Sequence, residues 1–484
     1  MLKQLEDKYK RVVATVNPDV KKYVNAGREL RLSLYSTLLV TATVTTLYYM
    51  RILDFSDSLT TVLITALILA PWVKVIDTVS SVSSLRKKIE QELAFLLVAS
   101  AAVSKTGLEL AEMLKYVSSS RVFKGLRALG ERFVQLSNLF GSSQAMHMLS
   151  RIASGKTRLL LTEYAASLSS GTALYLLRDR ASDIVKSAAV DADRAVQSRV
   201  VFGLMLTIAF GIAPSLLVGM MMLQSISIEG SVVEPGPEAY IYSVAVASIL
   251  PLVLVLIPGY PLSMSIVIDK KLSRILNALT LVGAVLLSAP AVILVTNGDI
   301  ESFKDSVFNY ALFSLVAGAP GFILVIEQLF SSRVDAVVED MLNHVRVWRS
   351  LHLYKSSVLE KEAKRRVRPW IVDYLVEALG FFKQVGDCDP GVFELLVMYI
   401  HECKRSLRKY VQTLAVILAV VLISPAMNSS ILSFGAKLFP QHIILGYISS
   451  IAYGFVASKI ALGENKSTLL PALSALIYAL TLPA

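Results

Sequence analysis

Nine stretches of mainly apolar residues, most of them about 20 residues long, dominate this sequence. They cover residues 32–50, 58–73, 200–223, 239–257, 275–295, 307–326, 411–432, 438–457 and 467–484. A helix of about 20 residues crosses the roughly 30 Å hydrocarbon core of a bilayer. The chain is 54% hydrophobic and only 18% charged, which is too apolar for an ordinary soluble domain. The sequence therefore predicts an all-α, polytopic membrane protein with about nine transmembrane helices.

The distribution of Lys and Arg predicts the orientation, because these residues resist translocation. Eight of them lie in residues 1–31, which we expect to be a cytoplasmic N-terminal segment. Alternation through nine spans then puts the C-terminus outside. The outer connections carry three of the 48 basic residues but eight of the 37 acidic ones. We therefore expect a multi-pass protein of the cytoplasmic membrane, and no cleavable signal peptide, since the first apolar run begins after residue 31.

Two long segments, residues 74–199 and 327–410, interrupt the spans. Both are rich in helix formers and poor in Gly and Pro, which predicts two cytoplasmic helical-bundle domains. Two spans over 32–73 would precede the first bundle, four spans over 200–326 would separate the bundles, and three spans over 411–484 would follow. The apolar run at 258–268, beyond the fourth span, suggests an interfacial helix.

The stretch IASGKTRLLL, residues 152–161, contains the Gly-Lys-Thr end of a phosphate-binding loop. A complete loop also needs glycine five positions before Gly155, so that backbone N–H groups can cradle phosphate, but that residue is Ser150. The preceding residues favour helix, whereas the loop should leave a β-strand. The five histidines and two cysteines show no metal-ligand spacing, and no catalytic constellation is present. We expect no enzyme activity, no cofactor and no metal.

A resemblance to a known family is carried by the run IEQELAFLLVASAAVSKTGLELAEML and the segments after it. The chain resembles the F-domain platform proteins of type II secretion and type IV pilus systems, and nine spans are similar to the archaeal pilus and archaellum assembly branch. The second block departs from the family pattern over much of its length. The residues that match family motifs are Glu92, Leu93, Gly107, Glu131, Gly141, Gly171 and Gly386.

This resemblance implies a cytoplasmic six-helix bundle, repeated twice, with membrane helices after each copy. It also implies a non-enzymatic membrane platform on which a hexameric secretion ATPase acts from the cytoplasmic side. The implied partners are this ATPase, pilin or archaellin subunits, membrane lipid and a second copy of the chain in a homodimer.

 The alternative to a platform function is a secondary transporter or channel, which would need polar or charged groups within the membrane. The predicted span interiors contain no Asp, Glu, Lys or Arg, and their prolines are compatible with broken helices or with ordinary kinks.

Three basic stretches are candidate docking surfaces for the ATPase. Arg121, Lys124 and Arg127 recur every three residues, as on one helical face. Equally, such stretches suit a solvated face or anionic lipid headgroups. Aromatic residues do not interleave with these charges in the pattern of a nucleic-acid-binding module, so nucleic acid is not an expected partner. The remaining members of the candidate set are Arg86, Lys87, Lys88, Lys361, Lys364, Arg365, Arg366 and Arg368.

Overall fold

The computed structural model describes Tyr35 and most of the chain from residue 88 onward. The described ranges are 88–103, 110–153, 155–214, 265–297, 299–329, 333–348, 357–385, 389–432, 440–463 and 467–482, with isolated residues at 216, 219–220, 246, 249–250, 253–254, 257 and 260. Residues 1–31 and the predicted spans at 32–50 and 58–73 lie outside them, apart from Tyr35, as does most of the span at 239–257.

Helices make up nearly all of the described chain. A helix over residues 88–103 is followed by α4 (Leu110–Ser118), α5 (Lys124–Phe140), α6 (Ser142–Ile152), α7 (Gly155–Ser170), α8 (Ala173–Leu206), the π-helix η2 (Thr207–Ile212), α11 (Lys270–Asn297), α12 (Ile300–Leu329), α13 (Arg333–Trp348), α14 (Ser357–Ala363), α15 (Trp370–Val385), α16 (Pro390–Leu432), α17 (Pro440–Leu462) and α18 (Leu469–Thr481). The residues before Gly155 form α6, so their predicted helical character is confirmed.

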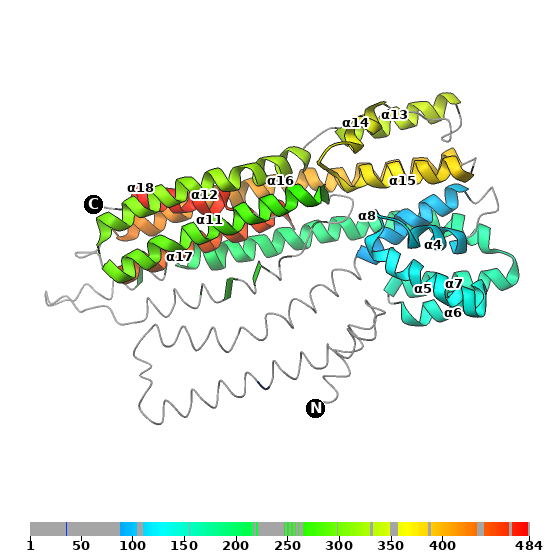
Figure 1. The fold of residues 1–484 in the computed structure, drawn as a ribbon, viewed down its shortest axis with the longest axis horizontal. Helices are drawn as coiled ribbons and strands as arrows, with labels where there is room; N and C mark the ends of the chain where they lie inside the picture. The colour runs from blue at the N-terminus through cyan, green and yellow to red at the C-terminus, as the bar shows by residue number, and fades with distance from the viewer. Residues whose placement is uncertain are drawn as a thin grey trace.

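The helices are arranged in two parts along the long axis of the molecule (Figure 1). One part, the helical body, contains helix 88–103, α4–α7, α13–α15 and the N-terminal portions of α8 and α16. The other part, the apolar layer, contains α11, α12, α17, α18, η2 and the C-terminal portions of α8 and α16. Both segments predicted to be cytoplasmic therefore lie at the same end of the molecule.

Five described helices are long and apolar enough to cross a membrane. They cover Tyr175–Ile212, Lys270–Leu294, Ile300–Glu327, Leu414–Leu432 and His442–Leu462. The last predicted span contains α18, which has 13 residues and is a shorter apolar helix. An all-α membrane protein is thus supported, while the count of nine spans stays a prediction. Pro290, Pro320 and Pro425 each lie inside a continuous helix.

One short sheet departs from the all-α expectation. Strand β1 (Ile266–Ile268) pairs antiparallel with β2 (Val367–Pro369), with Val267 opposite Arg368. The predicted interfacial helix is therefore wrong for residues 266–268. Their three β-branched side chains favour extended backbone, and Pro369 is tolerated because the sheet has only two strands, both of them edges. The sheet ties the segment before α11 to the segment between α14 and α15.

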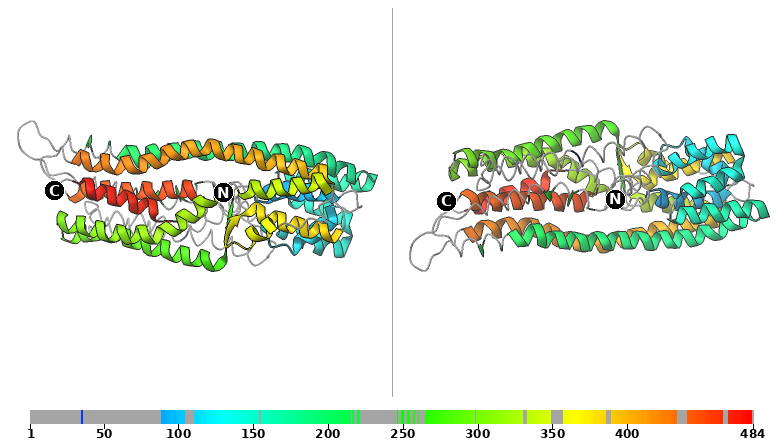
Figure 2. Two further views of the ribbon diagram at one scale, coloured as in Figure 1. Left: turned by 90° about the horizontal axis from the view of Figure 1, so that it is seen from above. Right: turned by 90° about the horizontal axis from the view of Figure 1, so that it is seen from below.

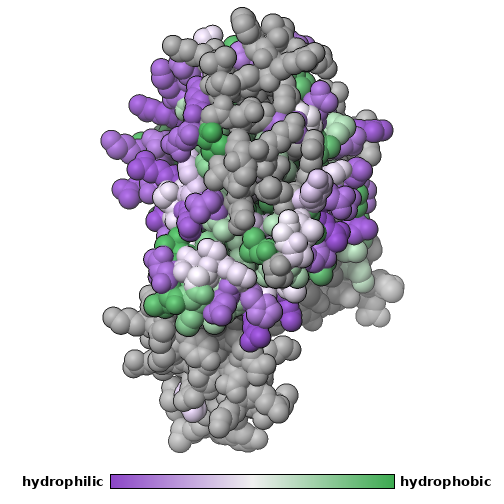
Figure 3. All heavy atoms as spheres, turned by 90° about the vertical axis from the view of Figure 1, so that its right-hand side faces the viewer, coloured by the Kyte–Doolittle hydropathy of each residue, from purple (hydrophilic) through white to green (hydrophobic). Residues whose placement is uncertain are grey.

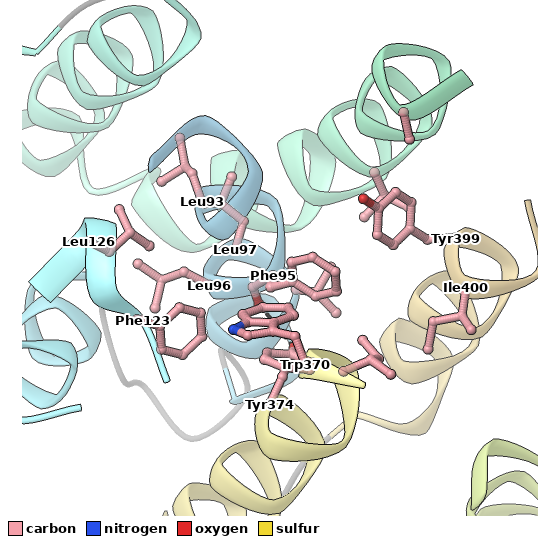
Figure 4. Packing of buried hydrophobic residues seen from close by; sticks show 14 of the residues in the cluster. Leu93, Phe95, Leu96, Leu97, Phe123, Leu126, Trp370, Tyr374, Tyr399 and Ile400 are labelled. Carbon is pink, nitrogen blue, oxygen red and sulfur yellow. Dashed lines mark hydrogen bonds between the residues drawn. The ribbon is translucent and has the colours of Figure 1, made fainter. Parts of the chain in front are cut away.

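A single hydrophobic core joins the two segments of the helical body. The ring of Phe95, on helix 88–103, lies 4.9 Å from that of Trp370 and 4.8 Å from that of Tyr374, both on α15, and 5.2 Å from that of Tyr399 on α16 (Figure 4). The Tyr374 hydroxyl donates to the Phe95 carbonyl at 3.1 Å. Aromatic edge-to-face contacts of this kind add about 0.5–1.5 kcal/mol each to the free energy of burial. The two segments, separate in sequence, thus form one packed body.

Two long helices connect this body to the apolar layer without a break. α8 has 34 residues and continues directly into η2, and α16 has 43 residues, or about 64 Å at 1.5 Å per residue. They run side by side along one edge of the molecule (Figure 2). A displacement of the body would therefore move the apolar layer through helical backbone rather than through loops.

Candidate functional site

At the junction between the helical body and the apolar layer, a buried carboxylate is hydrogen-bonded to the start of a helix. Glu92, on helix 88–103, is 1% exposed. Its carboxylate accepts hydrogen bonds from the backbone N–H of Gly125 at 2.9 Å and of Leu126 at 2.7 Å. These N–H groups belong to the first turn of α5, where a helix has no internal acceptors. Glu92 therefore caps a helix that begins 32 residues later in the chain.

Opposing effects act on the ionisation of Glu92. Burial raises the pKa of its carboxyl to about 7, while the N–H groups of Leu126 and Gly125 and the nearby charges of Lys88 and Lys124 act in the other direction. Both protonation states are consequently populated near neutral pH.

Gly125 makes this cap sterically feasible, although the sequence analysis did not single it out. A Cβ atom at residue 125 would lie 3.0 Å from Ile89 Cγ1, 3.2 Å from the Ile89 nitrogen and 3.1 Å from Glu92 Oε2. A Cβ atom at this position would require helix 88–103 to move by a few tenths of an ångström. The sequence signal was a glycine in the first turn of a helix, which is disfavoured unless packing requires it.

A cavity of about 380 Å³ lies beside this cap. Lys88, Glu92 and Lys124 line it from the body, and β1 and residues of α11 and α12 line it from the apolar layer. Lys88 and Lys124, two of the predicted basic candidates, are thus brought together around Glu92.

Arg121, Lys124 and Arg127 do not share one helical face. The Ser120 hydroxyl accepts from the N–H groups of Val122 and Phe123, both at 3.1 Å, which forms a turn before α5 starts at Lys124. Arg121 lies in this turn, so that prediction is wrong. Arg127 forms an exposed ion pair with Glu131, at 2.9 Å.

The second basic stretch is partly engaged within the fold. Arg365 pairs with Glu362 at 3.0 Å, and Arg368 pairs with Asp373. The carbonyl of Arg366 accepts the Asp269 N–H at 2.8 Å, next to the β1–β2 sheet. Lys361 and Lys364 are exposed on α14 and in the turn after it. Arg365 and Arg368 therefore stabilise the body, which leaves the exposed Lys361, Lys364 and Arg366 as the better candidates for a partner.

The other residues of the family pattern have varied positions. Leu93 is buried in the core. Gly141, between α5 and α6, and Gly171, between α7 and α8, have φ angles of 81° and 69°, a region that glycine adopts at little cost. Arg86, Lys87, Gly107 and Gly386 lie outside the described residues.

Arg199, which the sequence analysis missed, anchors α8 to the end of α17. Its side chain is 1% exposed and donates to the carbonyls of Lys459 at 2.7 Å and Ile460 at 3.1 Å. Its guanidinium carbon lies 4.2 Å from the centre of the Tyr260 ring. A cation at a helix C-terminus is favoured because the last carbonyl groups have no internal donors. Arg199 sits where the charged part of α8 gives way to apolar sequence.

The π-helix η2 is bonded to two neighbouring helices. Ser424, on α16, donates to the Gly211 carbonyl at 2.6 Å. The hydroxyls of Thr207 and Tyr453 lie 3.0 Å apart, and Tyr453, on α17, donates to the Ile417 carbonyl at 2.9 Å. π-helical turns free carbonyls from the regular ladder and recur at functional sites. These contacts attach η2, which continues α8 within the apolar layer, to α16 and α17.

Comparison with protein-family models, curated proteins and solved structures gives no match.

Proposed function

We propose that the chain is a non-enzymatic membrane platform for assembly of a type IV pilus-like filament, a pilus, archaellum or secretion pseudopilus. In this proposal a cytoplasmic hexameric ATPase acts on the helical body, and the spans seat or lift pilin subunits. The N-terminus would lie inside the cell and the C-terminus outside. The proposal rests on the sequence resemblance together with one feature of the fold.

That feature is the continuity of α8 and α16 between the helical body and the apolar layer. A platform that transmits motion needs a compact part on which force acts and stiff connections to the membrane. The shared core around Phe95 supplies the first. The two helices supply the second, since Arg199 attaches α8 to α17 and Ser424 attaches η2, which continues α8, to α16.

The membrane-distal end of the body is the proposed docking surface. The α7–α8 turn lies there, because α8 runs from it toward the apolar layer, and the α5–α6 turn lies there, because α5 starts at the junction. Leu139 and Tyr175, which flank these turns, are 74% and 84% exposed. The view onto this end of the molecule shows hydrophilic residues interspersed with smaller groups of hydrophobic ones (Figure 3). Apolar residues set in a polar surface suit a protein partner.

The experiment changes the stiffness of α8 at exposed positions, and the Gln197 to Asp193 hydrogen bond of 2.8 Å is lost equally in the variant and its control. Arg194, Gln197 and Ser198 are exposed on the portion of α8 next to the apolar layer. Replacing all three by Gly should reduce filament assembly while the ATPase still binds, since each Gly costs about 1 kcal/mol of helix stability relative to Ala. The matched control replaces the same three residues by Ala.

Filaments on cells of the source organism would be counted by electron microscopy, with chain and ATPase levels checked by immunoblot. Normal filament numbers with the triple Gly variant would contradict the proposed role of α8 as a stiff connection. Normal filaments after deletion of the gene, or substrate-coupled flux in liposomes, would reject the platform in favour of the transporter alternative.

A further inference from the structure

The cavity at the junction has a charged lining on one side and an apolar lining on the other. Lys88 and Lys124 lie on the side of the helical body. Leu276 of α11 and Val325 of α12 lie on the side of the apolar layer. Ser273 and Asn277, one turn apart on α11, also line the cavity. The cavity therefore offers ammonium, hydroxyl and amide groups next to an apolar wall.

The charge of this lining favours an anion. Glu92 is the acidic residue among the lining side chains, and its carboxylate is directed at the N–H groups of Gly125 and Leu126. Its negative charge is thus partly balanced by the start of α5, where the helix dipole is positive. The two lysines leave the cavity with a net positive charge whichever protonation state Glu92 adopts.

The position of the cavity points to the bilayer surface. The helix segment Lys270–Leu294 is long and apolar enough to span a membrane, and Ser273 and Asn277 lie in its first turns. Ile275, on the same turns, is 56% exposed and suited to acyl chains. The volume of about 380 Å³ falls within the range of small-molecule sites.

We propose that this cavity binds the phosphate-bearing headgroup of an anionic phospholipid, with Lys88 and Lys124 contacting the phosphate and Ser273 and Asn277 contacting its polar substituent. Charge-assisted hydrogen bonds from lysines to phosphate are strong and do not need fixed geometry. A lipid held there would join the helical body to α11 and α12. This inference is independent of the platform proposal.

The test measures the thermal unfolding midpoint of the delipidated full chain in detergent. Phosphatidylglycerol should raise the midpoint in a saturable way, because a ligand that binds only the folded state stabilises it. Phosphatidylcholine should raise it much less. Lys88→Gln with Lys124→Gln should weaken the apparent affinity at least tenfold, and Ser273→Leu, which narrows the cavity without changing charge, should also weaken it.

The matched control is Lys186→Gln with Lys383→Gln, which removes two exposed lysines outside the cavity and should bind like the unaltered chain. An equal loss in both double variants would mean diffuse surface attraction and would overturn the proposal. An equal shift with phosphatidylcholine, or no shift with either lipid, would also overturn it. The same saturable shift with inorganic phosphate alone would assign the site to a free phosphate ion and reject the lipid.

Discussion

Replacing Glu92 by Gln should remove a specific dependence of stability on pH. In the folded chain the pKa of Glu92 is raised from 4.5 to about 7, chiefly by burial. The folded state therefore binds a proton more tightly than the unfolded state between these two values. Stability contributed by this group is fully present below pH 4.5 and falls as the pH rises through about 7.

The size of the effect follows from the shift. At about 1.4 kcal/mol per pKa unit, the unaltered chain should lose about 3 kcal/mol of stability relative to Glu92→Gln between pH 4.5 and pH 8. Gln keeps one oxygen acceptor for the α5 N–H groups but does not titrate. Subtracting the two chains removes the contribution of the other titrating groups.

The assay is thermal or denaturant unfolding of both chains in detergent at pH 5, 6, 7 and 8. Glu163→Gln is the control, since Glu163 is a partly exposed residue paired with Arg180 at 3.0 Å. The reasoning is refuted if the difference between the unaltered chain and Glu92→Gln stays constant with pH, or if the unaltered chain gains stability as the pH rises.

Three further substitutions test the packing of the junction and the apolar layer. Gly125→Ala should destabilise the chain by about 1–3 kcal/mol through overpacking, whereas Gly380→Ala, where a Cβ atom would meet nothing within 4 Å, should be neutral or stabilising in the same unfolding assay. Arg199→Met should cost about 2–3 kcal/mol by leaving the end of α17 without its charged donor, and exposed Arg194→Met should change the midpoint little. Gly454→Ala should lower the midpoint further than Gly380→Ala, because its Cβ atom would lie 2.5 Å from Pro471 Cα.

The sequence by itself determined the features that depend on local pattern. Long apolar runs become helices because lipid cannot satisfy free backbone groups, and α11, α12, α16 and α17 lie where such runs were predicted. The residues before Gly155 are helical as expected from their composition. Glu92 was singled out as part of a motif, without a role that the sequence could assign.

Tertiary structure decided what depends on residues far apart in the chain. The cap requires the carboxylate of Glu92 to lie within hydrogen-bond distance of the Gly125 N–H, 33 residues later in the chain. Neither the hydrophobic periodicity nor the composition of the sequence predicts that contact. Arg199 reads as an ordinary surface residue until the end of α17 is placed against it. The strand at Ile266–Ile268 forms only because Val367–Pro369 pairs with it, and a three-residue strand has no stability alone. Likewise, Trp370 joins two segments into one body because burying their apolar faces against each other removes more surface from water than either segment can alone.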